Sequence, residues 1–248
     1  MGMDTTTLKG LTVLEALVRS AESRSAGELA QELGLVRSNV HRTLQTLVHA
    51  GYVEAIANSA KYRPTLRLWE MGNIVVQRFD IRKLAYPTMR DLAAHTGETI
   101  LLAVRQGLEV YFMEKIQTEK PVGTFVLLGA RAPIYCTAPG KAILSRCDRA
   151  ELQALPESFE RFTDRTITAR EALILELEKA RVQGYAINTS EWREGVNSLG
   201  VPIIAPGGNA LGAISVTGPD TRVTMKKLRD FAPVLVDAVG KLSRSLGG

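Results

Sequence analysis

SAGELAQELGLVRSNVHRTLQTLVHAGY, from Ser25 to Tyr52, contains two helix starts and two helix ends within one short stretch. Ser25 followed by Glu28 is a capping-box pattern, in which each side chain accepts a hydrogen bond from the other residue's amide. Gly34 and Gly51 supply the left-handed conformation at which helices commonly end. The stretch therefore predicts two helices joined by a tight turn. The second has an apolar stripe at the 3.6-residue period, formed by Val40, Leu44, Leu47 and Val48.

The opposite face of the second helix carries side chains that can form hydrogen bonds and none that is acidic. No Asp or Glu occurs between Leu33 and Val53, whereas solvated helix faces usually mix Glu with Lys. Arg, Asn, Gln and Ser pair with base edges or phosphates in the DNA major groove. We therefore predict a DNA-reading helix, with an ordinary solvated helix as the alternative. The residues predicted to contact DNA are Arg37, Ser38, Asn39, Arg42 and Gln45.

A hairpin is predicted directly after this helix pair, where YVEAIANSAKYRP, from Tyr52 to Pro64, reads as strand, polar turn and strand. A first helix is expected over Thr7 to Ser20, with Thr7 as its cap. The order helix, helix, helix, hairpin is that of a winged helix-turn-helix. Lys61 and Arg63 on the return strand are predicted phosphate contacts, and ordinary surface charge on a hairpin edge is the alternative.

The composition is that of a globular chain of 248 residues with 45% hydrophobic residues and a net charge of +5. Up to Asp80 there are nine basic and eight acidic residues, so local placement rather than net charge indicates nucleic acid. No apolar run approaches roughly 18 residues and no leader pattern opens the chain, so we expect a cytoplasmic protein with no membrane partner. Cys136 and Cys147 lack a CxxC spacing and His95 is the nearest histidine, so no metal and no cofactor is expected.

Several blocks of sequence, in the same order and at similar separations, resemble the IclR family of bacterial transcriptional regulators. LKGLTVLEAL, ELAQELGLVRSNVHRTLQTLVHAGYV and KYRPTLRLWEMG resemble the family's winged helix-turn-helix and linker. GARAPIYCTAPGKAIL at 129–144, GYAINTSEWREGVNSLGVPI at 184–203 and LGAISVTGP at 211–219 resemble its effector domain. The resemblance covers nearly the whole chain.

This resemblance implies an α+β protein with a winged helix-turn-helix DNA-binding domain at 1–64, a linker helix at 65–80 and a GAF-like effector-binding domain with an antiparallel sheet at 81–248. Apolar residues spread around the linker, from Leu66 to Phe79, so we expect it to pack outside its own domain. The family pairs two DNA-binding domains through this helix and the first helix. That implies a homodimer or a dimer of dimers on a palindromic operator in double-stranded DNA; a helix packed only within its own chain is the alternative.

Helices and strands alternate through the predicted effector domain, which indicates an α+β fold. The helices are expected at Pro87–His95, at Ala138–Arg146, from a cap at Thr168 to Gly184, and at Thr224–Leu246. The strands are expected at Thr99–Arg105, Glu109–Ile116, Val122–Leu128, Tyr185–Thr189, Val201–Ala205 and Ala213–Thr217.

The resemblance also implies a small-molecule site in this domain. Its residues fall on Thr124, Ala138, Pro139, Gly140, Asn188, Ser198, Ser215 and Thr217. Amides at the start of the helix from Ala138 favour a carboxylate, so a small organic acid is the expected effector. Two departures from the family pattern bear on its identity: Asn188 stands where some relatives carry aspartate, and Pro139 has no amide to donate. The alternative is that Ser215 and Thr217 merely satisfy neighbouring groups in a sheet.

Catalysis is not expected. TAPGKA is not a phosphate-binding loop, because Tyr135 stands where the motif requires glycine. The chain has three histidines, two of them in the predicted DNA-binding domain, so a nucleophile has almost no candidate base. The sequence thus predicts a DNA-binding transcriptional regulator whose operator affinity responds to an organic acid. Alternatives are a sensor that acts through protein contact rather than DNA, and a GAF-like enzyme.

Overall fold

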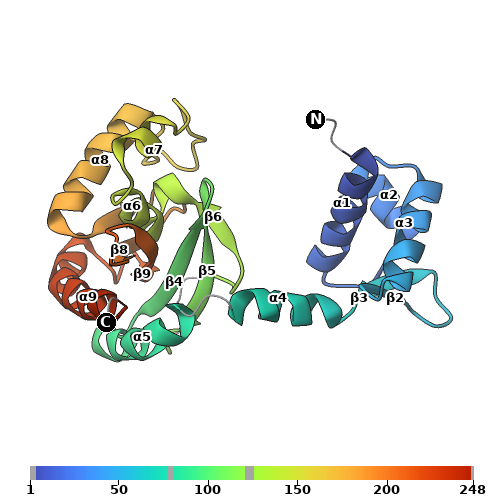
Figure 1. Ribbon diagram of the computed structural model, residues 1–248, viewed down its shortest axis with the longest axis horizontal. Coiled ribbons are helices and arrows are strands. Elements are labelled where there is room, and N and C mark those ends of the chain that lie inside the picture. Colours follow the sequence, from blue (N-terminus) through green and yellow to red (C-terminus); the bar gives the residue numbers. More distant parts are fainter. Residues whose placement is uncertain (1–3, 78–80, 121–125, 247–248) are drawn as a thin grey trace. The chain divides into compact units, whose positions relative to one another are not determined.

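The computed structural model describes residues 4–77, 81–120 and 126–246, and the chain divides into two compact units (Figure 1). The first unit is Met1–Phe79 and the second unit is Asp80–Gly248. Each unit has its own apolar core.

The first unit is a three-helix bundle with a small antiparallel sheet in the order β1-β3-β2. Its core is formed by one apolar face from each helix and by Val53 and Tyr62 of the sheet. The elements are α1 (Thr5–Arg19), β1 (Arg24–Ser25), α2 (Ala26–Leu33), α3 (Arg37–His49), β2 (Val53–Ala55) and β3 (Lys61–Pro64).

The local signals of the helix pair take their expected form. The amide of Glu28 donates to Ser25 Oγ at 3.3 Å, and the amide of Ser25 donates to Glu28 Oε2 at 2.6 Å. Gly34 ends α2 with φ of 63°, in the left-handed region. The first helix, however, starts two residues earlier than Thr7, because the carboxylate of Asp4 accepts from the amides of its first turn. Asp4, not Thr7, is its cap.

A single helix, α4 (Arg67–Gln77), follows the hairpin. Its side chains Trp69, Met71 and Ile74 are exposed in the single chain, and so is Leu66 just before it, at 81%. Leu8 and Leu11 on α1 are exposed as well. Phe79, the last apolar residue of the predicted linker, lies outside the described residues.

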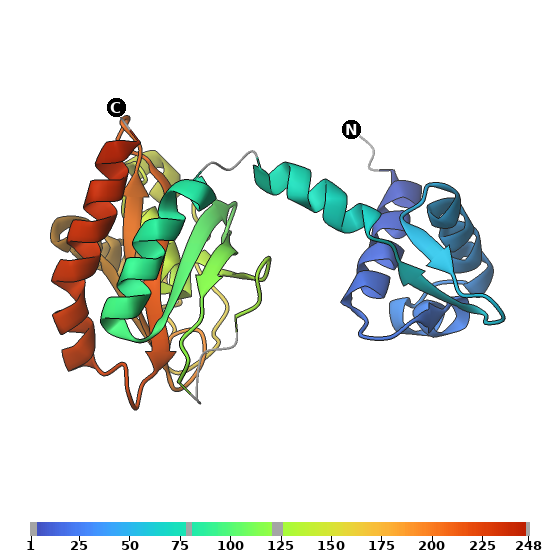
Figure 2. The ribbon, with the colours of Figure 1, turned by 90° about the horizontal axis from the view of Figure 1, so that it is seen from below.

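The second unit is built on a six-stranded antiparallel sheet in the order β6-β5-β4-β9-β8-β7. Side chains alternate between the faces: Ile100 and Leu102 pack with α5 and α9, whereas Leu101 and Ala103 pack with α6 and α8. Figure 2 shows α5 and α9 side by side on one face. The elements are α5 (Ile81–Thr96), β4 (Thr99–Gln106), β5 (Glu109–Ile116), β6 (Arg131–Pro133), η1 (Ile134–Cys136), α6 (Ala138–Leu144), α7 (Arg149–Gln153), α8 (Arg170–Gln183), β7 (Ala186–Thr189), β8 (Val196–Ile204), β9 (Ala210–Pro219) and α9 (Met225–Ser245).

Two expected helix starts in the second unit are wrong. The helix placed at Pro87 begins six residues earlier, at Ile81, because Ile81, Ala85 and Met89 form one buried stripe on both sides of the proline. Thr168 caps no helix, since α8 begins at Arg170 without a side-chain cap and the carbonyl of Thr168 accepts from the amide of Phe159 instead.

Two strands also differ from expectation. Of the strand expected at Val122–Leu128, residues 122–125 lie outside the described residues and Val126–Leu128 is not a strand. The neighbour of β5 is β6, whose Ala132 pairs with Val110. Strand β8 begins at Val196 rather than Val201, which adds Ser198 to the sheet. This longer strand positions the site described next.

Candidate DNA-binding surface and effector pocket

The outward face of α3 is polar, and its inward face is packed into the core of the first unit. Val40 and Leu44 are buried. All five side chains predicted to contact DNA are exposed: Arg37, Ser38, Asn39, Arg42 and Gln45. The helix thus presents donors and acceptors on a rigid support, as base readout in a major groove requires.

Three of these side chains, Asn39, Arg42 and Gln45, have hydrogen-bond partners within the chain. Arg42 Nη2 donates to Asn39 Oδ1 at 3.4 Å, and Gln45 Nε2 donates to the hydroxyl of Tyr62 at 3.1 Å. Tyr62 belongs to β3 and to the buried core. The hairpin and α3 are therefore held to one another through Gln45.

The two hairpin cations differ in their surroundings. Arg63 is paired with the carboxylate of Glu54 on β2, and both side chains are largely exposed. An exposed pair of this kind contributes at most about 1 kcal/mol. Lys61 is half-buried, and in the described part of the chain it forms no ion pair.

A pocket in the second unit, called here the inner pocket, brings most of the predicted effector residues together. Pro139, Asn188, Ser198, Ser215 and Thr217 all line it. The register of the sheet explains this, because Asn188 pairs with Ser198 and Ser198 pairs with Thr217 across three adjacent strands. The remaining lining is Leu101, Phe112, Val126, Thr137, Trp192, Arg193 and Val196.

Ser215 is the distinctive polar group of the inner pocket. Its Oγ is buried and has no hydrogen-bond partner among the described residues. Two other polar groups of the lining already have partners: Asn188 Oδ1 accepts from the amide of Glu191 at 2.8 Å, and Thr217 Oγ1 donates to the carbonyl of Asn197 at 3.5 Å. Because buried polar groups are nearly always paired, the free hydroxyl indicates a place for a ligand or water.

Two of the three positions expected to offer an amide to a carboxylate, Pro139 and Gly140, have none free. Gly140 donates its amide to Thr137 Oγ1, which caps α6, and Pro139 has no amide. Ala138 and Gly140 are buried but are not among the lining residues. Gly140 is required instead by packing, since a Cβ there would lie 2.1 Å from the carbonyl oxygen of Ile134. Thr124 lies outside the described residues.

Sequence reasoning missed the cation of the inner pocket, Arg193. Its guanidinium lies over the ring of Trp192, 4.2 Å from the ring centroid. Both residues belong to the SEWREGV stretch quoted for the resemblance, but no periodicity marked them as pocket residues. Arg193 is exposed and Ser215 is buried, so the lining combines an accessible cation with a free hydroxyl and apolar walls, which suits an organic anion.

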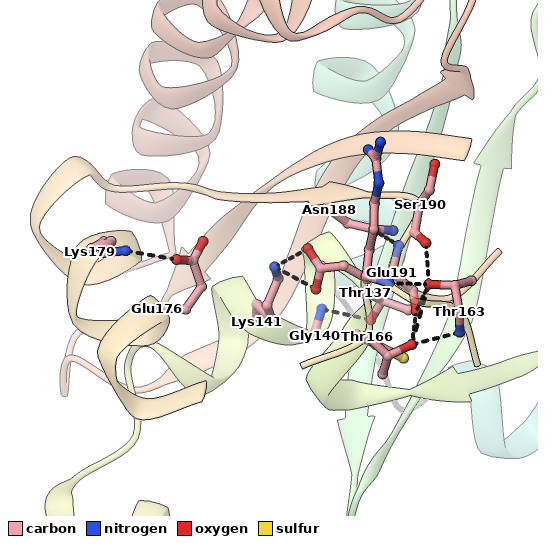
Figure 3. A network of polar contacts seen from close by, with 12 residues as sticks. Thr137, Gly140, Lys141, Thr163, Thr166, Glu176, Lys179, Asn188, Ser190 and Glu191 are labelled. Carbon is pink, nitrogen blue, oxygen red and sulfur yellow. Dashed lines mark hydrogen bonds and ion pairs between the residues drawn. The ribbon is translucent and has the colours of Figure 1, made fainter. Parts of the chain in front are cut away.

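A buried ion pair holds the loop that carries Trp192 and Arg193 (Figure 3). Lys141 Nζ of α6 lies 2.6 Å from Glu191 Oε1 and 2.8 Å from Oε2, with both side chains buried. Burial raises the pKa of Glu191, and the charge of Lys141 opposes that rise. The hydroxyls of Thr163 and Thr166 donate to the backbone carbonyls of Ser190 and Glu191. This network fixes one wall of the inner pocket.

Cys136 and the metal-binding residue types of the described chain are not arranged for catalysis or metal binding. Burial raises the pKa of Cys136 to about 12, so its thiol is a weak nucleophile at neutral pH. Within residues 4–77, 81–120 and 126–246 there is no group of three His, Cys, Asp or Glu side chains that could hold a metal ion. No helix in the same ranges is long and apolar enough to cross a membrane.

Comparison with known proteins identifies the architecture. Residues 6–56 match the family profile for the IclR helix-turn-helix domain, and residues 73–244 match that for the bacterial transcriptional regulator IclR C-terminal domain. The chain belongs to the IclR family. Over 244 residues it is 34% identical to the HTH-type transcriptional regulator KdgR of Escherichia coli, covering 97% of this chain and 92% of that protein.

Other IclR-family proteins are also similar to this chain over nearly its full length. The chain is 32% identical to the HTH-type transcriptional regulator XynR of Escherichia coli, with 96% of each protein covered. The crystal structure of IclR from Thermotoga maritima superposes with a TM-score of 0.81 at 30% identity, covering 99% of this chain and 100% of that one. This IclR-family chain is therefore a DNA-binding transcriptional regulator and not an enzyme. Its α+β fold with an antiparallel sheet is confirmed.

Proposed function

We propose that this IclR-family regulator acts in the cytoplasm as a homo-oligomer on a palindromic operator, and that a small organic acid bound in the inner pocket changes its operator affinity. The observation that carries the proposal is the unpartnered hydroxyl of Ser215 in a pocket whose lining also includes Arg193. The class of effector follows from those two groups and from the apolar side chains around them.

The roles proposed on DNA follow from exposure and residue type. Ser38, Asn39 and Arg42 read base edges from α3, with Arg37 and Gln45 beside them. Lys61 and Arg63 neutralise phosphates from the hairpin. The absence of acidic residues along α3 supports this assignment, because a carboxylate there would repel the DNA backbone.

The effector is proposed to be an acid with an apolar body. Arg193 pairs with the carboxylate, Ser215 and Ser198 donate hydrogen bonds, and Leu101, Phe112 and Trp192 surround the body. A solved IclR homologue from Microbacterium hydrocarbonoxydans, 22% identical with a TM-score of 0.77, is complexed with 4-hydroxybenzoate, an acid of this kind. The pocket here encloses about 30 Å³, little more than room for water, so an effector must move its walls.

Pairing of two chains would cover the exposed apolar side chains of the first unit. Leu66 and Trp69, and Leu8 and Leu11 on α1, are exposed apolar side chains of the kind buried in subunit interfaces. A twofold pair places two α3 helices on half-sites separated by a helical turn or a multiple of it. An effector that binds one arrangement of the pair better than another shifts operator affinity by the difference.

The test is binding of the purified protein to the intergenic DNA beside its own gene, at two salt concentrations, with and without a panel of small aromatic and aliphatic carboxylates. Specific binding that weakens steeply with salt and that one acid strengthens or abolishes is the expected result. Retention of an acid without any salt-sensitive DNA binding would favour a sensor that acts through protein contact. DNA binding that no acid changes would contradict the effector class.

A further inference from the structure

A second cavity lies at the open edge of strand β8, away from the polar row of the inner pocket. Strand β7 pairs with β8 only as far as Gly200, which pairs with Ala186. Beyond that point, Val201–Ile204 has β9 on one side and, among the described residues, no strand on the other. A cavity of about 520 Å³ occupies this place, between the ends of α6 and α8 and the last turns of α9. We call it the edge cavity.

Two arginines and no acidic residue line the edge cavity. They are Arg146, just after α6, and Arg244, near the end of α9. Within the described part of the chain neither guanidinium forms an ion pair. Arg146 Nε is buried and has no hydrogen-bond partner there. The cavity thus contains a cation whose donors are incompletely used.

The charges around Arg146 and the apolar walls of the edge cavity also suit a bound anion. Burial lowers the pKa of Arg146, and the nearby charge of Arg181 on α8 lowers it further. The charged form of Arg146 is therefore destabilised by its surroundings, and a bound anion would stabilise it. The walls, in contrast, are apolar and include Val201 and Val236.

We propose that the edge cavity is a second ligand site, which takes an organic anion with a carboxylate or phosphate group and an apolar body. The anionic group lies between Arg146 and Arg244, whose planar guanidinium groups match both kinds of oxyanion. The apolar body lies on β8 and α9. A volume of about 520 Å³ is that of a small-molecule site, and the edge cavity shares no lining residue with the inner pocket.

This site bears on α9. Ser243 Oγ accepts from the amide of Ile204 at 3.0 Å, and this contact joins the end of α9 to the open edge of β8. Gly240 lies against the Arg244 side chain: a Cβ at Gly240 would lie 3.5 Å from Arg244 Nη1, in ordinary van der Waals contact. A ligand held between Arg146 and Arg244 therefore connects α6 to α9 across the sheet edge.

The test is calorimetric titration of the full-length protein with phenyl phosphate, benzoate, inorganic phosphate and neutral benzyl alcohol. It is carried out in a Ser198→Ala/Ser215→Ala background, which weakens binding at the inner pocket. Saturable binding of phenyl phosphate or benzoate, and not of benzyl alcohol, is expected; the stronger of the two identifies the headgroup. Arg146→Gln and Arg244→Gln should each weaken it about tenfold or more. Arg229→Gln, which removes an exposed charge from the same helix, should leave it unchanged.

Gly240→Leu keeps both arginines and fills the cavity, so it should abolish binding while favouring the helix. This variant and Arg244→Gln carry the test if Arg146→Gln fails to fold, as judged by circular dichroism. The proposal is overturned if no probe binds saturably, if Gly240→Leu binds as well as its parent, or if Arg229→Gln weakens binding as much as Arg244→Gln. Inorganic phosphate binding as tightly as phenyl phosphate would refute the apolar half of the site.

Discussion

The outward face of α3 and the inner pocket both contain several polar side chains, but these side chains differ in their exposure to solvent and in how they are held. On α3 the groups are exposed, come from one helix and are hydrated until DNA displaces the water. In the inner pocket all but Arg193 are buried, they come from several separate segments, and the loop beside them is held by a network in which Lys141 and Glu191 are paired away from solvent. Side chains of the first kind contribute to binding but little to folding, whereas those of the second kind contribute to both. Substitutions can separate the two cases.

The largest effect is expected from Lys141→Met. It leaves the carboxylate of Glu191 buried without its cation, which destabilises a protein by about 3–5 kcal/mol. Urea denaturation, followed on the second unit, measures the change. Lys179→Met is the matched control, because Lys179 is exposed where it pairs with the partly buried Glu176, and its loss should change stability by less than about 0.5 kcal/mol. Equal effects of the two variants would show that the buried pair does not hold the pocket wall.

The same variant has a predicted pH dependence. Burial raises the pKa of Glu191, and Lys141→Met removes the charge that opposes the rise. A carboxyl whose pKa is higher in the folded than in the unfolded state binds its proton more tightly when folded. The variant should therefore regain stability as the pH falls and lose it as the pH rises through the raised pKa. Denaturation curves of the variant and the parent protein at pH values from about 4 to about 8, where most proteins stay folded, measure this change. A loss of stability that does not depend on pH would mean that lost packing, not charge, is responsible.

Next in size is the loss of operator binding on Arg42→Ala. A bidentate contact to a base contributes about 1–3 kcal/mol, so affinity should fall roughly tenfold to a hundredfold. Because Arg42 is exposed, stability and effector binding should not change. Fluorescence anisotropy with labelled operator measures the affinity. Arg19→Ala removes an exposed arginine of α1 in the same unit and controls for charge alone; the assignment of α3 fails if the two variants lose affinity equally.

A smaller effect with a change of sign is expected in the inner pocket. Ser198→Ala with Ser215→Ala should weaken the effector response about tenfold through the lost hydrogen bonds. Ser215→Ala alone should raise the stability of the second unit by about 1 kcal/mol, because its buried hydroxyl has no partner in the described structure. Ser145→Ala is the control, since Ser145 Oγ donates to the carbonyl of Ala142 at 2.7 Å and its loss should destabilise. A loss of stability in both variants would show that Ser215 is satisfied internally.

The first of these regions was far easier to predict from the sequence than the second. Ser25 with Glu28, and Gly34, act on their own neighbours, so α2 and α3 could be placed without knowing the fold. The polar row of Asn188, Ser198 and Thr217 depends on strand register, and only the family resemblance indicated it.

The errors have the same physical origin. Lys141 and Glu191 are 50 residues apart, and no local pattern relates them. Arg193 enters the lining of the inner pocket through the course of its loop, which no local pattern in the sequence marks. Pro87 predicts a helix start, a position that proline favours, but the buried stripe through Ala85 and Met89 continues the helix across it.

The smallest effect concerns the two cations of the hairpin. Lys61→Ala should reduce the slope of log affinity against log salt by about one and weaken binding to all DNA sequences alike. Arg63 is partly neutralised by Glu54, so Glu54→Gln should do the reverse, with a gain of up to about 1 kcal/mol in affinity for any DNA. Salt titrations on operator and on unrelated DNA separate the two cases. If Glu54→Gln changed affinity for the operator alone, the Arg63 side chain would be contacting a base. Base contacts would then come from the hairpin as well as from α3, and the assignment of the hairpin to phosphates would be wrong.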